Sequence, residues 1–203
     1  MKKYTRFLPL LIGLLAIPPH ALAGDPAVMS EVMKRRMNRV AMIPDTLQNK
    51  GFEEVSATGK LPGWTAVVHT GNSYRIEPDQ GQVFSGKYSL VIENTGKPEW
   101  GGAIQTIRAE GLAGQEVELS ARLKTQGVTA PGFSLMLKIM QMGRELEIVK
   151  TQGQFIGEAD WQAVSLRAML PKETTHLEII LTLAGDGRVW VDDVSVGPLA
   201  EKQ

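Results

Sequence analysis

Two adjacent carboxylates interrupt an apolar segment near the C-terminus. Residues 187–196, GRVWVDDVSV, combine β-branched and aromatic side chains with Asp192 and Asp193. Successive side chains of a strand point to opposite faces, so the two carboxylates cannot share a face. By parity Asp192 is expected on the packed face, with Trp190, Val194 and Val196, where an unpaired charge is costly. We therefore expect Asp192 to have a partner: a cation, a backbone donor or a basic side chain.

Few other residues suggest catalysis. The chain has no cysteine, which excludes disulfides, thiolate metal sites and a cysteine nucleophile. His69 and His176 lie in strand-like sequence without a Gly-x-Ser-x-Gly or His-Glu-x-x-His pattern. Glu145 and Glu147 share one face of one strand, whereas a glycosidase needs two carboxylates facing each other across a cleft. The sequence therefore predicts no catalytic residue, and a small glycan-active enzyme is the least favoured function.

The first 23 residues have the three parts of a secretory signal peptide. A basic start is followed by the apolar run Phe7–Ile17 and by the small-residue pattern Ala21–Ala23 before Gly24. The run is too short to anchor the chain in a bilayer, so cleavage is expected to leave no transmembrane anchor. An uncleaved N-terminal anchor is the alternative. The predicted location is periplasmic or secreted.

Composition limits the partners. The full chain carries 22 basic and 22 acidic side chains, and loss of the basic signal peptide leaves a slight acidic excess. This balance gives no nucleic-acid footprint. A chain of 203 residues fits one domain with additional N-terminal segments, and its length is sufficient for a sizeable core.

Residues 24–46 are predicted to form an amphipathic helix and a linker. From Pro26 to Met42, apolar side chains rich in methionine recur at helical spacing opposite charged ones. Residues 43–45, Ile-Pro-Asp, are expected to end the helix. The helix either lies on the domain's own surface or docks on a partner or a membrane surface, because methionine faces adapt to different contacts.

The remaining domain, residues 47–203, is predicted to be all-β. Short alternating or β-branched runs separated by Gly, Pro and Asn, with no intervening helix, are typical of an antiparallel β-sandwich and exclude a parallel sheet. The expected strands are Phe52–Ala57, Trp64–Thr70, Ser73–Glu77, Tyr88–Asn94, Ala103–Glu110, Glu116–Lys124, Phe133–Gln141, Leu146–Thr151, Trp161–Leu170, Leu177–Leu183 and Arg188–Val196.

Two of these strands show which faces are expected to be buried. In Glu116–Lys124 and in Phe133–Gln141 every second residue is apolar, and the residues between them are largely polar. Each strand is therefore predicted to have one core face and one half-polar face, as in a sandwich sheet. The outer face formed by such strands either holds a ligand or is covered by the N-terminal helix.

Several short motifs carry a resemblance to a known family. In chain order they are Asn49–Glu54 (NKGFEE), Leu61–Trp64 (LPGW), Ser85–Leu90 (SGKYSL), Glu118–Lys124 (ELSARLK), Asp160–Gln162 (DWQ) and Trp190–Val194 (WVDDV). Over Leu47–Leu199 the chain resembles carbohydrate-binding modules of the xylan- and β-glucan-binding type. The resemblance implies a galactose-binding-domain-like jelly roll of two antiparallel sheets. It is less specific for the ligand, since one fold hosts several functions.

The resemblance also implies a structural calcium ion. In these modules a glutamate of the first strand and the first aspartate of the last strand meet backbone carbonyls of the Ser-Gly-Lys-Tyr-Ser loop around the ion. Carried over, this implies Glu53 and Asp192 as side-chain ligands, with carbonyls from Ser85 and Lys87. Oxygen ligands suit calcium, and such a site would tie the two ends of the domain together. The alternative is that Asp192 pairs with a basic side chain or caps a turn.

For a sugar, the resemblance implies aromatic and polar side chains on a concave sheet or in loops at its rim. Trp100, in the loop KPEWGG, has no apolar neighbours in sequence and is the predicted stacking residue. The other three tryptophans are predicted to be structural. Gln105, Arg122 and Lys138 are expected near Trp100 on the concave face, although each could also be a solvated sheet residue.

The leading prediction is an exported, non-catalytic module that binds a carbohydrate or glycan and carries a structural calcium. The low aromatic content, 6%, departs from a strong polysaccharide binder. The alternative is a cell-envelope interaction or assembly protein that uses the jelly roll and the Met-rich helix to dock a protein partner.

Overall fold

The computed structural model describes Glu31 and residues 43–69, 71, 73–96, 99–151 and 155–199. The predicted signal peptide and, apart from Glu31, the predicted amphipathic helix lie outside these residues. The chain divides into two compact units, Met1–Arg35 and Arg36–Gln203, and the strands all belong to the second. In the described part of the chain, no helix has the length and apolar character needed to cross a membrane.

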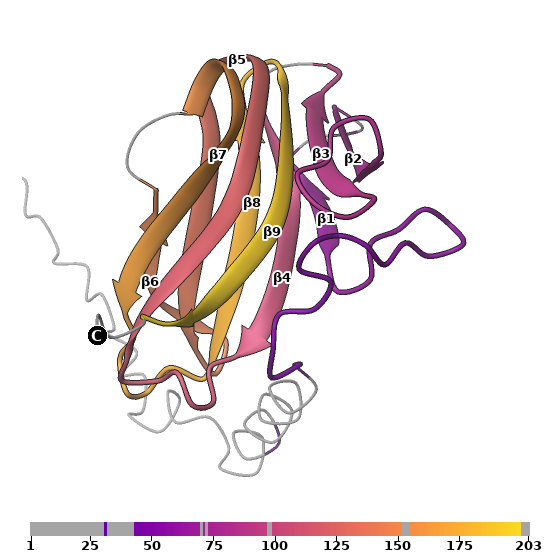
Figure 1. The fold of residues 1–203 in the computed structure, drawn as a ribbon. Helices are drawn as coiled ribbons and strands as arrows, with labels where there is room; N and C mark the ends of the chain where they lie inside the picture. The colour runs from indigo at the N-terminus through magenta and orange to yellow at the C-terminus, as the bar shows by residue number, and fades with distance from the viewer. Residues whose placement is uncertain are drawn as a thin grey trace, which may run out of the picture. The chain divides into compact units, whose positions relative to one another are not determined.

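The second unit is built from antiparallel strands, which confirms the all-β prediction (Figure 1). Every strand pairing among the described residues is antiparallel. The strands are β1 (Thr65–Val68), β2 (Tyr74–Asp79), β3 (Ser89–Asn94), β4 (Trp100–Arg108), β5 (Glu116–Gln141), β6 (Arg144–Lys150), β7 (Phe155–Met169), β8 (His176–Ala184) and β9 (Arg188–Pro198).

One strand, β5, joins the two layers of the sandwich. It is 26 residues long and contains both Glu116–Lys124 and Phe133–Gln141, which the sequence predicted as separate strands. Its first half pairs with β9 and β7, and its second half pairs with β8 and β6. The front layer in Figure 1 is therefore β2-β3-β9-β5-β7, and the back layer is β1-β4-β8-β5-β6. The two predicted sheets are thus one hydrogen-bonded sheet folded through β5.

Glycines allow β5 to bend between the layers. Gly132 has φ of 89°, and a Cβ there would lie 2.8 Å from the carbonyl oxygen of Phe155 on β7. Only glycine accepts both this backbone conformation and the close approach of the neighbouring strand. The sequence predicted two separate strands here, whereas the backbone between them continues the sheet.

The core lies between the layers. The apolar alternation predicted for β5 is confirmed, because Val117, Leu119, Ala121 and Leu123 face Phe133, Leu135, Leu137 and Ile139 within one buried cluster. Fully burying a side chain of this size contributes about 1.5 to 3 kcal/mol. The strands β3, β8 and β9 add further buried leucine, isoleucine and valine side chains to the same cluster.

A bulge in β9 changes the parity of its second half. Val189 and Val191 lie in the core, and so does Val194, because the pairing with β5 shifts register at Ser120/Arg122 and Asp193 has φ of 47°. Asp192 therefore shares the outward side with Trp190 and not with Val194 or Val196. The parity argument is correct for Trp190 and wrong for the two later valines, since a bulge adds a residue to the alternation.

The first predicted strand, Phe52–Ala57, is an irregular segment instead. Asn49 and Phe52 have φ of 46° and 60°, which lies in the left-handed region and not in the range of regular extended backbone. The side chain of Asn49 holds the turn, because its Oδ1 accepts the N–H of Glu54 at 2.9 Å and its Nδ2 donates to the Glu54 carbonyl at 2.8 Å. This turn still buries Phe52 against Trp64, with ring centroids 5.3 Å apart.

Candidate functional site

Asp192 is fully buried on the outer side of β9, and backbone groups satisfy it. Its Oδ2 accepts the N–H groups of Phe84 and Ser85, each at 3.1 Å, and its Oδ1 accepts the N–H of Asp193 at 2.8 Å. Burial raises the pKa of the Asp192 carboxyl, while the N–H groups of Ser85, Asp193 and Phe84 act to lower it. Of the three partners considered from sequence, the structure therefore shows the backbone donor.

Glu53 holds the same loop from its other end. Its two carboxylate oxygens each accept the N–H of Lys87 at 3.0 Å, and Oε1 also accepts the N–H of Tyr88 at 3.1 Å. Gly86 must be glycine here, because its φ is 68° and a Cβ would lie 2.3 Å from Glu53 Oε1. We call Glu53, Asp192 and the loop of residues 84–88 the carboxylate clasp.

The four residues predicted to hold calcium thus come together, but their contacts are those of hydrogen bonds. The groups that Ser85 and Lys87 direct at the carboxylates are N–H donors, and the Ser85 hydroxyl donates to Asp193 at 2.8 Å. Among the described residues, no group of three or more Asp, Glu or His side chains is placed to hold a metal ion. Calcium takes six to eight oxygen ligands, whereas the two carboxylates here are bonded to N–H donors. Calcium binding at the clasp stays a prediction.

The outer face of the back layer is the predicted ligand surface, and the strand register defines it. Directly opposite residues of antiparallel strands point to the same face. Each row of outward side chains therefore contains one residue of β4, one of β8 and one of β5. The rows are Trp100–Ala184–Gly132, Gly102–Thr182–Ser134, Ile104–Ile180–Met136, Thr106–Glu178–Lys138 and Arg108–His176–Met140. The face therefore has small side chains beside Trp100, an apolar row in the middle and charged residues beyond it.

Trp100 is the exposed aromatic side chain of this face. It is 40% exposed, and its neighbours across the sheet, Ala184 and Gly132, are too small to cover the indole. The His69 ring lies beside it, with centroids 5.6 Å apart and planes inclined by 34°. Glu99 Oε2 lies 2.9 Å from His69 Nδ1. These five residues, Trp100, Ala184, Gly132, His69 and Glu99, are called the Trp100 end, and they combine a ring surface with a partly exposed carboxylate–imidazole pair.

Tyr74 holds the Trp100 end in place. Its hydroxyl donates to the carbonyls of Glu99 at 3.0 Å and Gly185 at 3.2 Å, and its ring would lie 2.4 Å from a Cβ on Gly101. Burial raises the pKa of Tyr74 to about 12, with the nearby Asp186 and Glu99 carboxylates adding to the shift. Sequence reasoning missed this tyrosine. The paired glycines after Trp100 were the signal for such a close approach.

Lys138 lies on the same outer face as Trp100, but not beside it. The two belong to rows six residues apart along β4, which is about 20 Å in a strand. The Lys138 ammonium pairs with Glu145 at 3.3 Å and Glu178 at 3.6 Å. It therefore belongs to a charged group at the far end of the face.

The structure separates the other two predicted ligand residues from Trp100. Gln105 lies two residues after Ala103 on β4, so its side chain points to the same core side. Gln105 is only 2% exposed. Its amide accepts the Gln48 N–H at 2.6 Å and donates to the Gln48 carbonyl at 3.0 Å. Arg122 lies in the first half of β5, and its guanidinium stands 4.6 Å over the Phe84 ring on the front layer. The sequence could not show that β5 changes layer between Arg122 and Lys138.

Two hollows lie elsewhere in the described residues. One, of about 440 Å³, lies between β1 and β2, the end strands of the sheet order, and its lining includes the apolar side chains of Leu61, Trp64, Ile76 and Leu90. The other, of about 370 Å³, lies on the front layer and is lined mostly by polar and charged residues. Neither involves the Trp100 end.

Comparison with known proteins shows that several solved structures have a similar fold. No protein-family model matches the chain, and no curated protein matches it. The enzymatically active domain of tailspike protein 4 from bacteriophage CBA120 is similar with a TM-score of 0.60 at 13% identity, over 76% of this chain and 21% of that one. This chain thus spans about a fifth of the tailspike chain.

Two other similar structures are carbohydrate-binding modules or contain one. A family 61 module, in complex with β-1,4-galactotriose, gives a TM-score of 0.54 at 16% identity, over 76% of this chain and 99% of that one. The Clostridium thermocellum xylanase 10B, with a family 22 module and xylohexaose, gives 0.52 at 16% identity, over 78% of this chain and 28% of that one. At these identities the likeness concerns the fold, and it confirms the jelly roll of these modules.

Proposed function

We propose that the chain is a non-catalytic carbohydrate-binding module whose ligand lies on the Trp100 end of the back layer. The observation that carries the proposal is the exposed indole of Trp100 beside small cross-strand neighbours, in the fold that the galactotriose- and xylohexaose-bound structures share. Aromatic rings offer large, rigid contact surfaces, and the C–H face of a pyranose matches such a surface.

Polar groups around the indole would bind the hydroxyls of the sugar. Glu99 offers carboxylate oxygens as acceptors, and Thr182 and Ser134 lie in the adjoining row. Lys138 would contact only a ligand long enough to extend from Trp100 to the row Thr106–Glu178–Lys138. Gln105 and Arg122 take no part in this site, because one faces the core and the other lies on the front layer.

Export is the second part of the proposal. The signal-like residues 1–23 support delivery to the periplasm or the medium, where extracellular glycans occur. Expression of the full chain with fractionation of cells and medium, followed by N-terminal sequencing, tests it. If the protein keeps residues 1–23 and stays in the cytoplasm, the export proposal is wrong, whereas the proposed binding site is unaffected. The proposal does not depend on calcium.

A protein partner in the cell envelope is the second candidate. Ile104, Ile180 and Met136 form the apolar row in the middle of the same face, and an apolar row of this kind suits a protein contact better than a sugar. On that reading the Met-rich segment before residue 43 and this face would dock the partner together, and Ile104→Asp would abolish binding while Trp100→Ala would not.

Affinity electrophoresis and calorimetry on the exported chain test the carbohydrate proposal. The probes are xylan, β-1,4-galactan, xylohexaose and β-1,4-galactotriose. Trp100→Ala is expected to weaken binding about tenfold, or about 1.4 kcal/mol, because the loss of buried area adds to an aromatic contribution of about 0.5 to 1.5 kcal/mol. Met169→Ala is the matched control, because Met169 is also a large exposed side chain but lies on the front layer. Absence of binding to every probe would reject the proposal.

A further inference from the structure

The hollow of about 370 Å³ on the front layer has the features of a small polar binding site. Trp190 of β9 lies in it, mostly buried, with its indole N–H donating to Asp79 at 3.1 Å. The size falls in the range of small-molecule pockets. The full lining is Gln82, Lys124, Thr125, Gln126, Glu158, Ala159, Asp160 and Trp190.

A bulge in β7 shapes one wall of this hollow. Leu123 pairs with Gln162 and Thr125 pairs with Ala159, so Asp160 and Trp161 together oppose Lys124. The Asp160 carboxylate lies 2.9 Å from the Lys124 ammonium and also accepts the N–H of Trp161 at 2.8 Å. Bulges re-aim side chains and occur next to binding sites more often than elsewhere. Here the bulge presents a carboxylate and an indole on the same side of the sheet.

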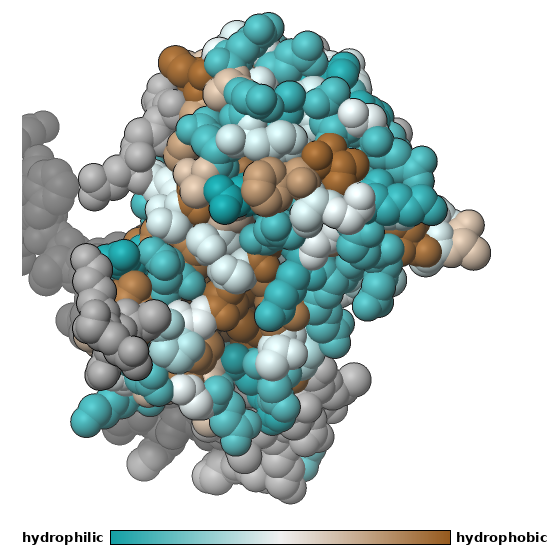
Figure 2. Space-filling view, viewed as in Figure 1, coloured by the Kyte–Doolittle hydropathy of each residue, from teal (hydrophilic) through white to brown (hydrophobic). Residues whose placement is uncertain are grey.

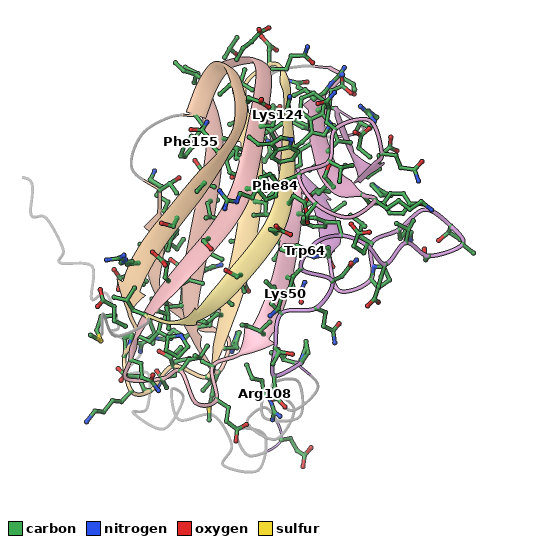
Figure 3. The ribbon with its side chains drawn as sticks, viewed as in Figure 1. Lys50, Trp64, Phe84, Arg108, Lys124 and Phe155 are labelled. Carbon is green, nitrogen blue, oxygen red and sulfur yellow. The ribbon has the colours of Figure 1, made fainter. Side chains whose placement is uncertain are left out.

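Aromatic side chains continue from the hollow along the front layer. Trp161 meets Phe84 edge to face with centroids 5.8 Å apart, and Phe84 is 41% exposed. Lys124, on β5, and Phe84, on the segment between β2 and β3, both lie over the front layer (Figure 3). The upper part of the face seen in Figure 2 is mainly hydrophilic, with a few hydrophobic side chains set among polar ones. The front layer therefore offers ring surfaces next to a polar hollow.

The charges of the lining indicate the kind of ligand. Lys124 donates, Glu158 and Asp160 accept, and the two glutamines can do both. An anionic ligand would meet two carboxylates against one ammonium, and an apolar ligand would remove water from the Lys124–Asp160 pair and from Glu158 at a cost. A neutral polyhydroxyl ring avoids both penalties, because each hydroxyl donates one hydrogen bond and accepts others.

We propose that this front-layer hollow, flanked by Trp161 and Phe84, is a second saccharide-binding site. The ligand class rests on the proposed function, but the site shares no residue with the Trp100 end. The two sites lie on the outer faces of opposite layers, so one chain would bind two glycan segments at once. Such bivalent binding raises the overall avidity for a polymeric glycan above that of either site.

The four tryptophans provide a direct readout. Each indole N–H gives its own signal in a ¹⁵N-edited NMR spectrum of the folded chain, and Trp→Phe variants assign the four signals. During titration with xylohexaose or β-1,4-galactotriose, the signals of Trp161 and Trp190 are expected to move together, with a dissociation constant different from that reported by Trp100.

Two variants separate the sites. Asp160→Ala is expected to weaken the front-layer site at least tenfold and to leave the Trp100 titration unchanged, and Trp100→Ala to do the reverse. Asp160 is suited to this test because its side chain is 84% exposed, so the fold should tolerate the change. Arg167→Ala is the control, since it breaks the exposed Arg167–Glu118 pair at the other end of the same layer.

The outcomes distinguish the two proposals. Shifts confined to Trp100, with one ligand bound per chain, would overturn the second site and leave the proposed function standing. Shifts confined to Trp161 and Trp190 would support the front-layer site and remove the Trp100 end as the binding surface. No shift with either oligosaccharide, and no binding to xylan or galactan, would overturn both.

Discussion

The carboxylate clasp and the Trp100 end use similar side chains for opposite purposes. In the clasp, Asp192 is fully buried and Glu53 and Asp192 accept five backbone N–H groups between them. At the Trp100 end, the indole, the imidazole of His69 and the carboxylate of Glu99 remain open to solvent. A buried polar group that is hydrogen-bonded to the backbone stabilises the fold, whereas a partly exposed side chain can be reached by a ligand. The following changes test this difference.

Asp192→Ala is expected to have the largest effect, a loss of about 3 kcal/mol of unfolding free energy. The substitution leaves the N–H groups of Phe84, Ser85 and Asp193 without their acceptor, and each buried unsatisfied group costs about 1 to 3 kcal/mol. Urea denaturation followed by tryptophan fluorescence measures it. Asp193→Asn is the control and should cost under about 1 kcal/mol, because asparagine tolerates the φ of 47° and keeps an acceptor for the Ser85 hydroxyl at an exposed position. Equal losses in the two variants would contradict the buried role of Asp192.

Gly86→Ala is expected to cost about 2 kcal/mol. The residue combines a φ of 68° with a Cβ position 2.3 Å from Glu53 Oε1, so both backbone strain and a clash result. Gly59→Ala isolates the strain, because Gly59 has φ of 74° but nothing within 4 Å of its Cβ position. The thermal midpoint should fall clearly further in Gly86→Ala than in Gly59→Ala. An equal fall of the thermal midpoint in the two variants would mean that the close contact between residue 86 and Glu53 adds nothing to the backbone strain.

Trp100→Ala is expected to change the unfolding free energy by less than about 0.5 kcal/mol, as exposed substitutions usually do. Together with a tenfold loss of glycan binding, this would identify Trp100 as a residue for ligand and not for stability. Differential scanning calorimetry of the two proteins without sugar is the measurement. A fall of several degrees in the thermal midpoint would show that the packing of Trp100 stabilises the fold.

Chelation is expected to have the smallest effect. If hydrogen bonds alone hold the clasp, EDTA leaves the thermal midpoint unchanged, because the carboxylates keep their N–H donors. The measurement is a melting curve of the purified chain in EDTA and after addition of calcium chloride. A fall of several degrees in EDTA that calcium restores, and that Asp192→Ala abolishes, would instead support the predicted calcium site.

The fold was largely predictable because apolar alternation is a local property. Leu119 and Leu135 each occupy the core position that their parity assigns. The motifs of the clasp also predicted that Glu53 and Asp192 meet. The alternation of faces gave wrong predictions only where the backbone is irregular. The bulge at Asp193 adds one residue to β9, so Val194 faces the core and not the side of Asp192.

The candidate site was less predictable because it depends on which layer a residue belongs to. Trp100 could be identified from the sequence KPEWGG, but it is the first residue of β4 and not a loop residue, and two of the neighbours assigned to it were wrong. Gln105 follows the core parity of β4, and Arg122 precedes the bend in β5. No local pattern distinguishes a strand that ends from a strand that bends into the other layer, as β5 does around Gly132.

The continuity of β5 has a mechanical consequence. Its first half carries Lys124 at the front-layer hollow, and its second half pairs with β8 beside the Trp100 end. A pull between two glycans held on opposite faces would therefore be carried along one covalent backbone. Resistance to that pull would come from the hydrogen bonds that β5 makes with β6, β7, β8 and β9, so the force would be shared among four neighbouring strands.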